Sequence, residues 1–107
     1  MAEDNARQQL LDFLDEKAFN PVLNADPQDY PESQRKKLDD VRKTTRSTQK
    51  RYHDNYTTAK DVVENYQSDL SSESAKAVQR ELRDLNLPTL DSIKPEFEDL
   101  ARKLGVK

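Results

Sequence analysis

The chain contains no cysteine and a single glycine, Gly105, and each scarcity excludes a class of site. Without cysteine there is no disulfide, no zinc site built on thiolates and no cysteine nucleophile. Loops that bind phosphate through their backbone need several glycines, so no such loop is expected. The absence of cysteine also fits a reducing compartment, and we expect a cytoplasmic location.

The chain also lacks a long apolar segment and a second histidine. No apolar run approaches the roughly 18 residues of a membrane-spanning helix, and the first residues are acidic, unlike the basic start of a signal peptide. His53, the only histidine, is predicted to point toward the basic side of its helix, with no second histidine or cysteine to share a metal. We therefore expect no membrane segment, no metal, no cofactor and no enzymatic activity.

Charged residues are what the chain has in abundance, at 36% of 107 residues against 33% hydrophobic residues. Leu, Ile, Val and Phe together number 22, which is close to the level at which chains stay disordered. A net charge of only -3 and the single glycine favour a folded chain instead. The length suits a single helical domain over residues 1–107 with a thin core.

Apolar residues recur at helical spacing, and no segment alternates as a strand would. The spacing predicts helices at residues 4–18, 31–70, 71–85 and 92–104. Asn20-Pro21 should end the first helix, Ser71 or Ser72 should cap the third, and Asn86 followed by Pro88 should end it. We predict an all-α fold, a small bundle of about four helices built on one long central helix.

The long helix over residues 31–70 would measure about 60 Å, which is long for a domain of this size. It must bend, project or be covered by a partner. Residues 44–48 are mostly weak helix formers, so if the helix bends, we expect the bend there. Its apolar stripe is interrupted by Thr45, Thr48 and Asn55, which pack poorly.

The apolar stripe of this helix is the predicted interaction surface. A monomer is feasible if the other three helices cover the long one, but a second copy would bury its tyrosines more fully. We therefore predict a homodimer formed through the long helix. The expected interface side chains are Val41, Tyr52, Tyr56, Ala59, Val63 and Tyr66.

Charge is segregated along the chain. Residues 1–34 hold eight acids and two bases, whereas residues 35–51 hold eight bases and two acids. At about 100° per residue, five of these bases share one face of the long helix, opposite its apolar stripe. This basic face consists of Arg35, Arg42, Lys43, Arg46 and Lys50.

Two functions are compatible with this pattern. The basic face could follow a nucleic-acid backbone, or it could be a solvated surface that the acidic N-terminal segment neutralises. The net negative charge and the lack of a helix-turn-helix, zinc-finger or RNP-like motif count against nucleic acid. We expect a non-catalytic helical interaction or assembly module that self-associates or binds another protein, with a nucleic-acid-associated protein as the alternative.

Overall fold

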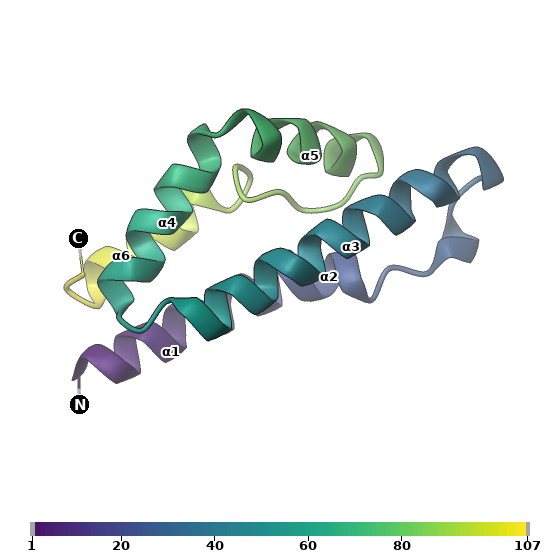
Figure 1. Ribbon diagram of the computed structural model, residues 1–107. Coiled ribbons are helices and arrows are strands. Elements are labelled where there is room, and N and C mark those ends of the chain that lie inside the picture. The colour runs from purple at the N-terminus through teal and green to yellow at the C-terminus, as the bar shows by residue number, and fades with distance from the viewer. Residues whose placement is uncertain (1, 107) are drawn as a thin grey trace.

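The structure is a computed structural model that describes residues 2–106, and side chains from residue 5 onward. Over these residues the fold is all-helical, so the predicted helical bundle is confirmed. The molecule is elongated, 47 × 22 × 21 Å, and α3 runs along much of it (Figure 1). α1 packs against α4 and α6, whereas α2 and α5 pack against α3. The elements are α1 (Ala2–Leu14), the π-helical turn η1 (Asp15–Phe19), α2 (Asn20–Leu23), the 3-10 turn η2 (Pro27–Asp29), α3 (Glu32–Asn55), α4 (Ala59–Ser71), α5 (Glu73–Asp84) and α6 (Lys94–Lys103).

The long central helix exists, but it ends at Asn55 and does not continue to residue 70 as predicted. Tyr56 adopts an extended conformation, and α4 turns back over α3 (Figure 1). Thr58 is the N-cap of α4, since its hydroxyl accepts a hydrogen bond from the backbone N–H of Asp61 at 3.1 Å. This cap starts a new helix where the apolar periodicity alone predicts an unbroken one.

A side chain from α1 stabilises the end of α3. The last carbonyls of a helix have no partner within the helix and need one from elsewhere. The Arg7 guanidinium donates hydrogen bonds to the backbone carbonyls of Tyr56, at 2.6 Å, and His53, at 2.8 Å. The corner between α3 and α4 is thus held by a residue distant in sequence.

The predicted bend at residues 44–48 is absent, because α3 is continuous through this segment. The Thr48 hydroxyl donates to the carbonyl of Thr44 at 2.9 Å, one turn earlier in the same helix. Side-chain bonds of this kind let threonine stay within a helix despite its weak propensity. The helix is interrupted instead between Asn55 and Thr58, where α3 ends and α4 begins.

The first helical segment passes Pro21, where the sequence predicts an end, and continues to Leu23. It does so through the π-helical turn η1, in which the N–H of Asn20 donates to the carbonyl of Asp15, five residues earlier. Proline has no N–H, and in a regular α-helix its ring clashes with the carbonyl four residues before it. The wider turn just ahead of Pro21 accommodates both effects.

Both ends of α5 lie where the sequence predicts them. The Ser72 hydroxyl accepts a hydrogen bond from the N–H of Ala75 at 3.2 Å and so caps the helix. At the other end Asn86 adopts a left-handed conformation with φ 58°, and the N–H of Leu87 donates to the carbonyl of Leu82 at 2.8 Å. Pro88 then prevents the helix from continuing.

Two separate clusters form the core, and α3 contributes to both. The minor core joins α2, α3 and the end of α5 through Val22, Leu38, Val41, Leu82 and Leu85. The main core joins α1, η1, α4 and α6 around Tyr52, with Tyr66 stacked on Phe97 at 4.0 Å between ring centres. Between the two clusters α3 presents Thr45 and Thr48, whose short side chains fill little space. The main core consists of Ala6, Leu10, Leu11, Leu14, Ala18, Phe19, Tyr52, Ala59, Val62, Val63, Tyr66, Ile93, Phe97 and Ala101.

The cap at Thr58 gives a direct test of the break. Thr58→Ala should lower the free energy of unfolding by about 1 kcal/mol, because the N–H of Asp61 loses its acceptor. Thr57→Ala, one residue earlier, removes only an exposed hydrogen bond of 3.3 Å to the Asp61 carboxylate and should change it by less than about 0.5 kcal/mol. Urea unfolding followed by circular dichroism measures both, and equal losses in the two variants would contradict the assignment of the cap.

Candidate functional site

A cleft of about 210 Å³ lies between the main core and the minor core. α3 forms one wall, η1 and α2 form a second, and α5 with the loop that follows it forms the third. Much of the lining is apolar and comes from Ala18, Phe19, Val22, Ala75, Val78, Leu82, Pro88 and Leu90. The polar lining consists of Thr44, Thr45, Thr48, Arg51, Asp69, Ser72, Ser74 and Gln79.

The cleft is open because short side chains face it from both helices. Beside the minor core, leucine and valine side chains join α3 to the end of α5. Between this point and Arg51, α3 presents threonines, and the first turn of α5 presents Ser74 and Ala75. These short side chains do not span the distance between α3 and α5, so the two helices leave space between them.

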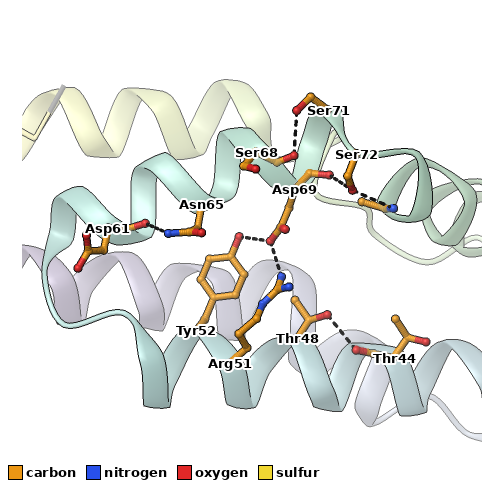
Figure 2. Close-up of polar contacts among 11 residues, drawn as sticks. Thr44, Thr48, Arg51, Tyr52, Asp61, Asn65, Ser68, Asp69, Ser71 and Ser72 are labelled. Carbon is orange, nitrogen blue, oxygen red and sulfur yellow. Dashed lines mark hydrogen bonds and ion pairs between the residues drawn. The ribbon is translucent and has the colours of Figure 1, made fainter.

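A buried tyrosine and two charged residues close the end of the cleft nearest the main core (Figure 2). The Tyr52 hydroxyl donates to Asp69 Oδ2 at 2.6 Å, and the Arg51 guanidinium donates to the same oxygen at 2.7 Å. Burial, with the Asp69 hydrogen bond next, raises the pKa of Tyr52 far above its usual range, so the hydroxyl stays protonated. These contacts fasten α3 to the last turns of α4.

A further ion pair lies beyond the minor core, where Lys37 Nζ is 3.4 Å from Asp84 Oδ2. It joins α3 to the last turn of α5. Arg51 and Asp69 are the charged residues that line the cleft, and they pair with each other. The cleft therefore carries no uncompensated charge among its described lining residues.

Thr45 is the buried residue of the cleft whose hydroxyl has no protein partner among the described residues; the Thr44 and Ser74 hydroxyls have none either, but both residues are exposed. Thr45 is only 7% exposed, lines the cleft, and makes no hydrogen bond through its hydroxyl to another residue of the described range. No fully buried side-chain nitrogen or oxygen among the described residues lacks a partner. The Thr45 hydroxyl is therefore reached from the cleft, where it can donate and accept a hydrogen bond.

Hydrogen bonds hold the loop wall of the cleft in place. Gln79, 5% exposed, accepts a hydrogen bond through Oε1 from the N–H of Asp91 at 2.7 Å. The Tyr66 hydroxyl, which belongs to the main core, donates to the carbonyl of Leu90. The loop is thus anchored from α5 and from α4, and the cleft has three fixed walls.

The residues predicted to form the interface lie mostly inside the chain. Val41 belongs to the minor core, and Tyr52, Ala59, Val63 and Tyr66 belong to the main core. Tyr56 is half-buried and packs edge-on against Tyr52, with 5.0 Å between ring centres. A partner would have to displace the chain's own helices to reach the five buried side chains.

The predicted basic face is largely engaged within the chain. The two arginines in its first half donate to backbone carbonyls, and the two lysines pair with aspartates one turn away on α3. The contacts are Arg35 with the carbonyls of Pro27 and Tyr30 at 3.2 and 3.3 Å, Arg42 with that of Leu23 at 3.1 Å, Lys43 with Asp39 at 3.2 Å, and Lys50 with Asp54 at 2.6 Å. Arg46 is exposed on the same helix. The two lysine–aspartate pairs therefore reduce the positive charge of this face, whereas Arg35 and Arg42 keep theirs.

His53 contacts an acid rather than the bases expected beside it. Its Nε2 lies 2.9 and 3.0 Å from the two oxygens of Asp15, and Gln49 Nε2 donates to the same carboxylate at 3.0 Å. The π-helical turn η1 begins at Asp15, so the contact joins η1 to α3. Over the described residues no group of three or more His, Cys, Asp or Glu side chains could hold a metal ion.

Comparisons of the chain with protein-family models, curated proteins and solved structures found no match. Within residues 2–106, no helix combines the length and the apolar character needed to cross a membrane.

The Tyr52 hydrogen bond predicts a specific dependence of stability on pH. The native state keeps the hydroxyl protonated, whereas the unfolded chain loses this proton above about pH 10. The stabilisation from Tyr52 is therefore complete below about pH 10 and decreases as the pH rises further. Tyr52→Phe removes this dependence, so the difference in free energy of unfolding between wild type and variant should shrink from about pH 8.5 to about pH 10.5.

Urea unfolding at both pH values measures this difference. Tyr30→Phe is the control, because the Tyr30 side chain lies outside both the main core and the Asp69 contact. A difference between wild type and Tyr52→Phe that stays constant over this range, or one that Tyr30→Phe reproduces, would refute the assignment.

Proposed function

We propose that this protein is a non-catalytic helical interaction module whose cleft between α3 and α5 receives part of a protein partner. The observation that carries the proposal is the Thr45 hydroxyl, which lies in the cleft with the rest of its residue buried and has no protein partner. Around it Ala75, Val78, Pro88 and Leu90 are partly exposed, whereas the other apolar lining residues are already buried. A partner that fills the cleft would bury this apolar surface and supply the missing hydrogen bond.

The chemistry of the cleft supports binding rather than catalysis. A general base needs a carboxylate or imidazole that is free to take a proton from a substrate. Asp69 already accepts hydrogen bonds from Tyr52 and Arg51, and His53 contacts Asp15 outside the cleft lining. The remaining polar groups of the cleft are hydroxyls and one amide, which suit recognition.

The position of the cleft supports a protein partner. It opens between two helices whose outer faces are exposed, so a partner segment could lie along both while one group enters the space between them. The lack of cysteine supports a cytoplasmic setting for this role. The nucleic-acid alternative stays a prediction, weakened by the internal contacts of the basic face.

Filling the cleft should abolish binding. Ala75→Leu adds a side chain that occupies the cleft, whereas Ala77→Leu adds the same side chain at an exposed position of the same helix. Both substitutions keep a strong helix former, so α5 should persist in each. We expect the wild type and Ala77→Leu to retain the same partner from a lysate of the source cells, and Ala75→Leu to lose it by at least tenfold.

Mass spectrometry of the bound fractions measures this loss, and circular dichroism checks that both variants are folded. If a folded Ala75→Leu chain retains every protein that the wild type retains, the cleft is not the interaction site and the proposal fails.

A second copy of the chain is the partner that the sequence predicts. Because five of the six predicted anchors are buried in the chain's own core, a dimer formed through α3 would have to use the cleft or the exposed side of that helix. Sedimentation equilibrium at micromolar concentration should give about twice the 12.4 kDa mass of one chain. A single species of one-chain mass up to about millimolar concentration would contradict self-association and leave a different protein as the partner.

A further inference from the structure

The size of the cleft indicates what kind of group enters it. An apolar cavity of about 150 Å³ binds benzene, so such a volume holds one six-membered ring. The cleft offers about 210 Å³ and is partly open to solvent, so it has room for one ring with a small substituent. The part of the occupant that enters it is therefore the size of a single substituted ring.

The walls of the cleft favour a ring with an apolar body. Phe19 lies on one side, and Val78, Leu82 and Leu90 lie on the others. Aromatic side chains pack well against aromatic and branched aliphatic neighbours, because they bury a large area with few rotatable bonds. An aliphatic chain of the same volume would lose more conformational entropy on entering.

The charges of the cleft exclude an ionised group. Arg51 and Asp69 share a hydrogen bond at 2.7 Å, and Asp69 also accepts from Tyr52. A phosphate, carboxylate or ammonium group would lose its hydration in the cleft without meeting a free opposite charge, which is costly. The occupant is therefore electrically neutral.

The polar atom of the occupant is assigned from Thr45, because the other cleft hydroxyls without a protein partner, those of Thr44 and Ser74, belong to exposed residues that water reaches. The Thr45 hydroxyl is open to the cleft and is without a protein partner among the described residues, whereas the neighbouring Thr48 hydroxyl already donates to the carbonyl of Thr44. A hydroxyl can both donate to and accept from another hydroxyl. We infer that the cleft between α3 and α5 receives a tyrosine side chain of the protein partner, with its phenol hydroxyl hydrogen-bonded to Thr45. This inference rests on the proposed function.

Binding of p-cresol, which is the tyrosine side chain without its backbone, tests the inference. The complete chain, labelled with nitrogen-15, is titrated with p-cresol, with toluene and with 4-methylphenyl phosphate, and amide shifts are followed by NMR. We expect p-cresol to shift the amides of Thr45 and Ala75 and to bind about fivefold tighter than toluene, which is the effect of one neutral hydrogen bond. The phosphate should bind at least about tenfold more weakly than p-cresol, because its charge finds no partner.

Two matched variants locate the hydrogen bond. Thr45→Val removes the free hydroxyl and should make the affinities for p-cresol and toluene equal. Thr48→Val removes the hydroxyl that is already bonded to Thr44, and should keep the preference for p-cresol. Ala75→Leu should abolish binding of both compounds.

Three results would overturn the inference: no shift of cleft amides by p-cresol, equal wild-type affinities for p-cresol and toluene, or tighter binding of the phosphate. Each of these results is measured on the wild-type chain, so the inference can be refuted even if a variant fails to fold. If p-cresol does not bind but Ala75→Leu still loses the protein partner, this inference fails and the proposed function stands. If Ala75→Leu keeps the partner, the proposed function fails independently of p-cresol.

Discussion

The contact between Arg7 and the last carbonyls of α3 is the constraint on which the remaining arrangement depends. It covers backbone groups that would otherwise be unpaired where the chain turns, and it ties that turn to α1. From this corner α4 runs back across α1, which builds the main core. The same direction brings Asp69 to Tyr52 and places α5 opposite α3. The cleft exists because α4 and α5 follow this course relative to α3.

Features fixed by neighbouring residues could be predicted from the sequence, and features fixed by distant ones could not. The Ser72 cap and the left-handed Asn86 depend on local chemistry, and both lie where expected. The end of α3 depends on Arg7, which is 49 residues from Tyr56, so periodicity alone could not reveal it. A local signal was nevertheless present, since Thr58 with Asp61 three residues later is typical of a helix start.

At the candidate site, too, local features could be predicted and features that depend on distant residues could not. Sequence spacing identified Tyr52 and Tyr66 as packed residues, and both are fully buried, but what covers them is the chain itself. The cleft was not predicted, because it is the space that two core clusters leave between them. Thr45 and Thr48 were the available sign, since both interrupt the apolar stripe of the long helix. Their role depends on α5, whose position no local pattern specifies.

The division of the core has a consequence for motion. Proteins open locally in cooperative units, and units with little buried apolar area open most readily. The minor core holds five buried residues against fourteen in the main core, and the Lys37–Asp84 pair beside it is exposed. We expect α5 to detach from α3 at this end, so that amide hydrogens there exchange faster than those around Tyr66. Such breathing would widen the cleft for an entering side chain while the opposite end, held at Asp69, stays closed.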